Sequence, residues 1–194
     1  MPEAHVANPP GDCRDAQDDL YPIFRQIHDH MQLDDTLTEG KAPFWREKTL
    51  SEMSQEEWES LCDGCGQCCL VKLQDEDTDE LLHTRLTCKL LDIGTCRCVD
   101  YENRHERVSD CAIVSPTTIE HLDWLPHSCA YRLLAEGREL YWWHPLVSGD
   151  RDSVHQAGIS VRDWATSEEG VPEGKMVRFI VKDPKLKQIL SGEE

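Results

Sequence analysis

The stretch "LCDGCGQCCL", residues 61–70, places four cysteines within eight positions: Cys62, Cys65, Cys68 and Cys69. Its spacers are two glycines, one aspartate and one glutamine, so the stretch does not resemble a segment of an apolar core. A C-x-x-C step lets two thiolates face one metal ion, and glycine permits the tight turn that this requires. The quartet therefore predicts a metal site.

Five more cysteines follow before residue 130, and together they define a metal-binding region over residues 62–129. The candidate ligands are Cys62, Cys65, Cys68, Cys69, Cys88, Cys96, Cys98, Cys111 and Cys129. Nine thiols exceed the four that one tetrahedral zinc site takes, so two sites, or one site with spare thiols, are both open. His83, His105 and His127 lie near cysteines in the sequence and could complete a Cys₃His site.

The spacing of the quartet fits either zinc or an iron–sulfur cluster as the cofactor. Cys62, Cys65 and Cys68 match the first three positions of a bacterial ferredoxin run, but the usual x₃-Cys-Pro does not follow them. The "CGQC" segment, residues 65–68, could also form a thioredoxin-like redox pair, although the expected βαβ context is missing. The sequence predicts metal binding and leaves the metal undecided.

Composition limits the partners and the compartment. Asp and Glu outnumber Lys and Arg by 38 to 20, for a formal net charge of −18, so we expect no nucleic-acid partner. No secretory-signal pattern and no apolar run of ~20 residues occurs, so we expect a cytoplasmic protein that does not enter a membrane. Ten cysteines in a reducing compartment argue for metal or redox chemistry rather than disulfides. A protein partner is possible.

The chain is expected to form a loose arm over residues 1–16 and one domain over residues 17–194. The expected fold class is α+β, a compact metal-stapled domain with short helices, few strands and long loops. The sequence patterns predict helices at 20–31, after Ser54, from Pro116 through 125 and over 128–137. They also predict extended chain through Leu86 and Cys88, and a strand at 175–183.

Several segments of the chain resemble the YcgN branch of the YkgJ-type cysteine-cluster proteins. They are "WESLCDGCGQCCLVKLQDEDTDE", "TCRCVDYENR", "WLPHSCAYRLLAEGREL" and "WHPLVSG", within about residues 43–165. The family's C-x-x-C-G-x-C-C motif falls on the quartet, and its downstream elements fall on Cys88, Cys96, Cys98, Tyr101, Arg104, Cys111 and Cys129. The wider family reads C-x-Y-x-x-R-P where this chain has "CRCVDYENRH", so ligand pairing is not carried over.

The resemblance implies a small bacterial protein with a zinc- or iron-chelating domain. The leading hypothesis, motivated by the quartet and the five further cysteines, is a metal-binding protein without catalysis of its own. A flagellin lysine-methylating enzyme shares the cysteine motif, which implies a second hypothesis: an iron–sulfur-dependent or thiol-redox enzyme that acts on a protein. Metal buffering or delivery is a third hypothesis.

Overall fold

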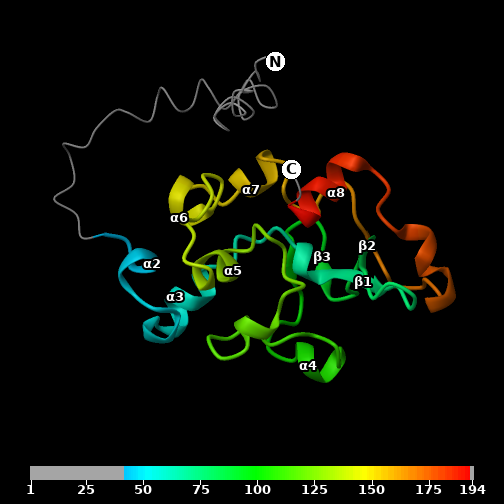
Figure 1. Cartoon of the computed structure of the whole chain (residues 1–194), viewed down its shortest axis with the longest axis horizontal. Coiled ribbons are helices and arrows are strands. Elements are labelled where there is room, and N and C mark those ends of the chain that lie inside the picture. The colour runs from blue at the N-terminus through cyan, green and yellow to red at the C-terminus, as the bar shows by residue number, and fades with distance from the viewer. Residues whose placement is uncertain (1–41, 193–194) are drawn as a thin grey trace, which may run out of the picture. The chain divides into compact units, whose positions relative to one another are not determined.

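The computed structural model describes residues 42–192 (Figure 1). The N-terminal arm, the domain start at residue 17 and the helix at 20–31 lie outside the described residues. From Pro43 the chain forms one compact unit. Its elements are α2 (Phe44–Glu47), η1 (Leu50–Glu52), α3 (Gln55–Ser60), η2 (Gln67–Cys69), β1 (Leu70–Gln74), β2 (Leu81–Thr87), β3 (Leu91–Asp92), β4 (Arg97–Cys98), α4 (Arg104–Arg107), η3 (Ile119–His121), α5 (Ala130–Ala135), α6 (Pro145–Ser148), α7 (Ser153–Gln156), β5 (Thr166–Ser167), η4 (Glu173–Phe179) and α8 (Pro184–Ser191).

Two small sheets and short helices make the fold a mixed α+β one, as the sequence predicts. β1 and β2 pair antiparallel, and β5 pairs parallel with the end of β2. β3 and β4 form a separate antiparallel pair. The segment that ends in Cys88 is extended, as expected, because β2 runs to Thr87. Helices this short are not stable by themselves, so packing must stabilise them.

The apolar residues gather in three small clusters rather than in one large core. The first joins α3, η3 and α5, the second joins the sheets to α8, and the third joins α7 to the aromatic segment before α6. Leu61 belongs to the first cluster, Leu70 to the second and Cys65 to the third. The stretch 61–70 therefore contributes to all three clusters, and its conformation is fixed from three sides.

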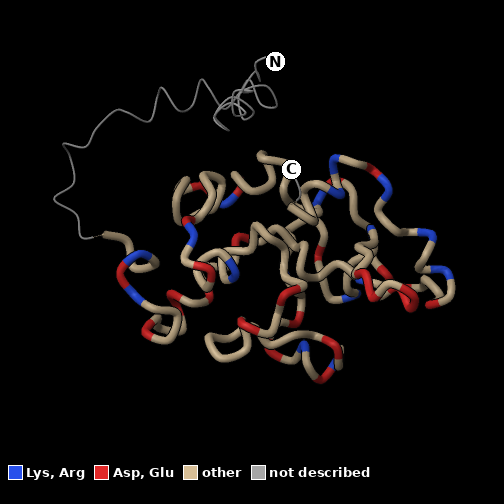
Figure 2. Tube along the Cα trace, viewed as in Figure 1, with Lys and Arg blue, Asp and Glu red and all other residues tan. Residues whose placement is uncertain are grey.

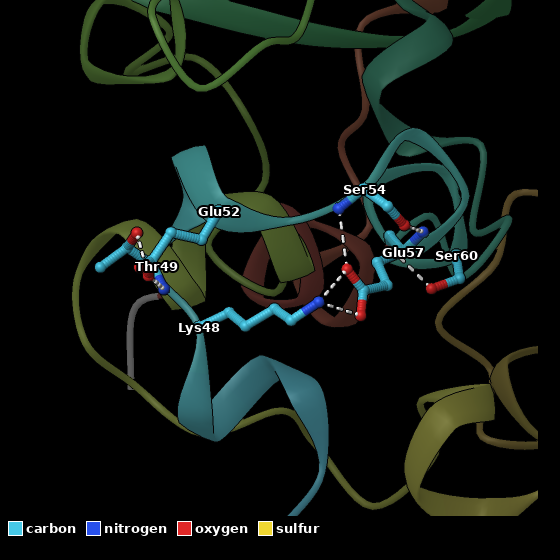
Figure 3. A network of polar contacts seen from close by, with 6 residues as sticks. All are labelled: Lys48, Thr49, Glu52, Ser54, Glu57 and Ser60. Carbon is cyan, nitrogen blue, oxygen red and sulfur yellow. Dashed lines mark hydrogen bonds and ion pairs between the residues drawn. The ribbon is translucent and has the colours of Figure 1, made fainter.

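The helix α3 that leads into the cysteine stretch begins with the predicted capping box (Figure 3). The Ser54 side chain accepts a hydrogen bond from the Glu57 backbone N–H at 3.2 Å. The Glu57 carboxylate in turn accepts from the Ser54 backbone N–H at 2.7 Å. Lys48 adds an ion pair to the same carboxylate at 2.6 Å. These contacts satisfy donors that a helix start leaves open.

Two predicted elements are wrong. From Pro116 the chain forms turns and the single 3₁₀ turn η3 instead of a long helix. The Thr118 hydroxyl donates to the Ile113 carbonyl at 2.7 Å and accepts from the Ser115 backbone N–H at 2.9 Å. Hydroxyl groups that bond the backbone in this way compete with helical hydrogen bonds.

The expected strand at 175–183 is mostly the 3₁₀ helix η4. Only Ile180 forms an isolated bridge, to Thr84 of β2, and the Val181 backbone N–H donates to the His83 carbonyl. β5 pairs with Leu86 and Thr87, further along β2.

Helix α5 lies within the predicted range 128–137, but its start differs in detail. Cys129, not Ser128, is the N-cap residue, and neither supplies a side-chain hydrogen bond to the cap. The Ser128 hydroxyl is buried without a hydrogen-bond partner. The chain leaves the helix at Gly137, whose φ of 68° is in the left-handed region, as expected for a glycine that ends a helix.

Candidate metal centre

The cysteine stretch begins at a residue that a buried histidine holds. His144 lies at the start of α6, 3 % exposed, and its Nδ1 accepts from the Leu146 backbone N–H at 3.1 Å. Its Nε2 therefore carries the proton and donates to the Leu61 carbonyl at 3.0 Å. Burial lowers the pKa of His144, so the ring is neutral at pH 7. This histidine fixes the chain directly before Cys62.

Two further contacts anchor the middle of the stretch to residues 159–161. The Val161 backbone N–H donates to the Cys65 carbonyl at 2.9 Å. Gln67 is completely buried, and its side-chain amide donates to the Ile159 carbonyl at 2.8 Å. A buried amide that bonds the backbone fixes the turn that carries Cys68 and Cys69.

Gly66 is required by both its conformation and its surroundings. Its φ of 74° is in the left-handed region, and a Cβ at this position would lie 2.8 Å from Val161 Cγ2. Val161 is completely buried, so it has little room to move. The expectation that glycine permits a tight turn between the cysteines is confirmed at this position.

Four of the predicted ligands interact with one another, and we call them the first thiol group: Cys62, Cys65, Cys68 and Cys129. Burial raises the pKa of Cys65, and that of Cys129 to about 12; negative charge on Cys68 adds to both increases. Packing around Cys62 raises its pKa to about 11, again with a contribution from Cys68. Cys129, although 60 residues further along the chain than Cys69, therefore joins the cysteines of the C-x-x-C steps.

Cys68 is the exception within the first thiol group. Its pKa is lowered to about 7, first by a hydrogen bond from Cys69, whose Sγ lies 3.9 Å away, and also by the charge of Lys72. The Lys72 ammonium donates to the Cys68 and Leu70 carbonyls at 3.1 and 3.0 Å and lies 4.7 Å from the centre of the Trp124 ring. An ammonium group fixed in this way stabilises negative charge on the thiols.

Three other cysteines form the second thiol group: Cys88, Cys98 and Cys111. Burial raises the pKa of Cys88 and Cys111, and negative charge on Cys98 contributes to both. The β3–β4 pair brings Cys98 opposite Leu91, whose N–H donates to the Cys88 carbonyl. Cys69 interacts with both groups, because its hydrogen bond with Cys68, its burial and negative charge on Cys68, Cys88 and Cys62 raise its pKa.

Cys96 lies apart from both groups. It is 4 % exposed and packs with Leu70, Leu91 and Val161 in the second apolar cluster. Its Sγ donates to the Ile93 carbonyl at 3.4 Å. Cys96 therefore packs in the way that a small apolar side chain does.

The three histidines that the sequence offered as a fourth ligand have other contacts. His105 Nδ1 lies 3.0 Å from the Cys111 carbonyl oxygen. His83 extends from β2, where burial and the charge of Lys72 lower its pKa to about 4. His127 lies against Gly192 at the end of α8.

The thiols fit zinc or iron by their chemistry, although their positions are not those of a closed site. All nine cysteines in the described residues are free thiols. Among residues 42–192, no three Cys, His, Asp or Glu side chains already lie close enough together to hold one ion. Thiolates are the ligands that zinc and iron–sulfur clusters prefer, and a metal deprotonates thiols whose pKa is raised. Movement of the thiol side chains would be needed to close the first group around an ion.

Sequence reasoning missed three residues that shape this region. Asp63 is 7 % exposed and accepts from the Cys65 backbone N–H at 2.9 Å. Arg97 Nη1 donates to Cys62 Sγ at 3.5 Å, and His144 fixes Leu61. The position of Asp63 inside the C-x-x-C step was a usable signal, whereas Arg97 and His144 are distant in sequence and depend on the fold.

Comparison with known proteins agrees with this chemistry. A family model described as "Putative zinc- or iron-chelating domain" matches residues 61–130, which contain both thiol groups. A UPF0260 protein of Nitrobacter hamburgensis is 54% identical over 142 residues, which cover 73% of this chain and 83% of that protein. The chain belongs to the UPF0260 family.

Other UPF0260 proteins match nearly as well. The relative from Parvibaculum lavamentivorans is 53% identical over 152 residues, which are 76% of this chain and 99% of that protein. The relative from Brucella canis is 59% identical over 125 residues, 64% of this chain and 82% of that protein. No solved structure matches the chain. Within residues 42–192, this UPF0260 chain has no helix with the length and apolar character that crossing a membrane requires.

Proposed function

We propose that the chain is a metal-binding protein whose first thiol group holds one zinc ion or one iron–sulfur cluster. The observation that supports the proposal is that negative charge on Cys68 raises the pKa of Cys62, Cys65 and Cys129, which belong to two segments distant in the sequence. Four thiolates complete a tetrahedral zinc site or the ligand set of a cluster. The second thiol group, with Cys69, would hold a second metal.

A metal held by the first thiol group would cross-link separate elements of the fold. Cys62 follows α3, Cys68 lies in η2, and Cys129 caps α5. A bound metal ion would supply covalent cross-links among these elements, and structural zinc typically stabilises by ~10–16 kcal/mol. Because the apolar residues form three small clusters rather than one large core, such a cross-link would add to the stability of the fold. Thiols used in this way stay reduced in the cytoplasm, where we place the protein.

Two substitutions for which we expect different effects on metal content test the proposal. Cys68→Ala removes an exposed ligand, so the purified chain should lose most of the metal of its first site. Cys96→Ala is the matched control because it removes a thiol that is buried outside both groups. It should keep the metal while its melting temperature falls. Equal metal content in Cys68→Ala and the unchanged chain would overturn the assignment.

One observation favours a second candidate, a thiol-redox function. Because the pKa of Cys68 is lowered to about 7, about half of this thiol is ionised at neutral pH, and Cys69 Sγ lies only 3.9 Å away. The rate at which iodoacetamide alkylates Cys68 separates the two functions. Metal binding predicts that Cys68 is protected until a chelator removes the metal. Rapid alkylation of the metal-loaded protein would favour the redox function.

A further inference from the structure

A small polar cavity lies beside the first thiol group, and we call it the arginine pocket. Its volume is about 160 Å³, and it is lined by Arg97, Arg151, Arg162 and His155 together with the aspartates Asp63 and Asp152. Three guanidinium groups at one place are unexpected in a chain of net charge −18, in which acidic residues are widespread, for example along the turn between β1 and β2 (Figure 2). The three arginines outnumber the two aspartates of the lining, so the pocket favours an anionic ligand.

Buried donors in the pocket have no partner. Arg162 Nε and His155 Nδ1 are both buried and make no hydrogen bond. Buried polar atoms are nearly always hydrogen-bonded, and both unsatisfied atoms belong to residues that line the pocket. Neither atom is accessible to solvent, so a rotation of these side chains would be needed to present them to a ligand. A neutral imidazole can donate from Nδ1, and a guanidinium only donates, so both atoms suit an acceptor such as an oxyanion.

The acidic residues of the pocket do not fill this role. Asp152 lies 3.8 Å from Arg162 Nη1, a long contact, and 67 % of its side chain is exposed. Asp63 accepts from the backbone N–H of Cys65. Neither aspartate forms a hydrogen bond with Arg162 Nε or His155 Nδ1.

The backbone leaves space for the arginine that joins the pocket to the thiols. Gly64 has a φ of 79°, and a Cβ there would lie 3.0 Å from Arg97 Nη2. Without that Cβ, the guanidinium of Arg97 packs over the cysteine stretch and donates to Cys62 Sγ at 3.5 Å. One arginine therefore contacts a candidate metal ligand and lines the cavity.

We propose that the arginine pocket binds a small oxyanion, a phosphate or carboxylate group of a small molecule, next to the first thiol group. Planar guanidinium groups match the paired oxygens of both anions. The cavity is several times the ~30 Å³ share of one water molecule in the liquid, which suits a group of a few heavy atoms. No cysteine lines the pocket, so an anion could bind there whether or not the proposed metal is present.

Titration of the full-length, metal-loaded protein with inorganic phosphate, followed by calorimetry, tests the proposal. We expect saturable binding at one site per chain. Arg162→Gln removes a donor in the wall, and Arg151→Gln removes an exposed guanidinium whose loss should not disturb folding. Each should weaken phosphate binding at least tenfold. Arg178→Gln, at an exposed arginine of η4 outside the pocket, is the matched control and should change nothing.

A parallel titration with succinate distinguishes the two sources of the oxyanion, since tighter binding of one probe identifies its class. Absence of saturable binding of both probes would overturn the proposal. Equal affinity in Arg151→Gln, Arg162→Gln and the unchanged chain would also overturn it. Metal content measured on the same samples separates this result from the proposed metal function, because the pocket variants should retain their metal.

Discussion

His144 Nε2 lies 3.0 Å from the carbonyl oxygen of Leu61, so a ring 83 residues away along the chain fixes the residue before the first cysteine. Both ring nitrogens are used, because Nδ1 accepts from the Leu146 backbone N–H. Leu61 is 1 % exposed, so water cannot replace this donor easily. The position of the cysteine stretch therefore depends on a residue outside the metal-binding region.

His144→Ala should lower the stability of the fold and weaken metal binding. The substitution leaves the Leu61 carbonyl and the Leu146 N–H without partners, and a buried unsatisfied group costs about 1–3 kcal/mol. Thermal unfolding followed by circular dichroism, with metal analysis, measures both effects. His121→Ala, at an exposed histidine, serves as the control and should stay within about 0.5 kcal/mol. Equal losses in the two variants would contradict the assigned role of His144.

Gly66→Ala should be more destabilising than Gly158→Ala. Both glycines have φ above 70°, and the left-handed conformation alone costs a residue with a Cβ about 1–2 kcal/mol. The added methyl at Gly66 would also meet Val161 at 2.8 Å, whereas nothing lies within 4 Å at Gly158. Overpacking typically adds about 1–3 kcal/mol. Chemical denaturation of the two variants measures the difference, and equal losses would rule out the close contact.

Ser54→Ala should remove one half of the capping box of α3. Loss of an N-cap hydroxyl costs about 1 kcal/mol. The metal content should not change, because Ser54 lies at the start of α3 and Cys62 beyond its end. Denaturation together with metal analysis checks this prediction, and a stability equal to that of the unchanged chain would mean that the cap contributes nothing.

Glu57 gives the capping box a pH dependence. The hydrogen bond from Lys48, followed by the one from the Ser54 backbone, lowers the pKa of the Glu57 carboxyl from its ordinary 4.5. A lowered pKa in the folded state means that the stabilisation is complete above the ordinary pKa and is lost as the pH falls through the folded-state value.

The melting temperature of the unchanged chain should therefore exceed that of Glu57→Gln at pH 7. The difference should shrink progressively below about pH 4.5. Because the comparison uses the difference between the two melting temperatures, acid effects common to both proteins cancel. A gap that stays constant down to pH 3 would contradict this role of Glu57.

Local chemistry explains which parts of this fold were predictable. The capping box of Ser54 and Glu57 and the exit of α5 at Gly137 depend on neighbours in the sequence, and both are present. The helix expected from Pro116 failed because the Thr118 hydroxyl bonds the backbone. The strand expected at 175–183 is a 3₁₀ helix as far as Phe179, and only Ile180 bridges to the sheet.

The candidate metal site, like the fold, was predictable only where it depends on neighbours in the sequence. The C-x-x-C spacing indicated which thiols could act, since tight turns are local. The sequence could not separate Cys96, which packs in an apolar cluster, from Cys98, two residues later, which joins the second thiol group. It also could not bring Arg97 to Cys62, because that contact requires the β3–β4 turn to fold over the cysteine stretch.

The central claim is that Cys62, Cys65, Cys68 and Cys129 share one metal. X-ray absorption at the metal edge tests it most directly, on the full chain purified without air, together with an assay for acid-labile sulfide. The account predicts four sulfur neighbours for each metal, at about 2.3 Å if the metal is zinc. Iron matched by sulfide would identify a cluster on the same ligands. A chain without metal, or a metal surrounded mainly by nitrogen and oxygen, would contradict the account.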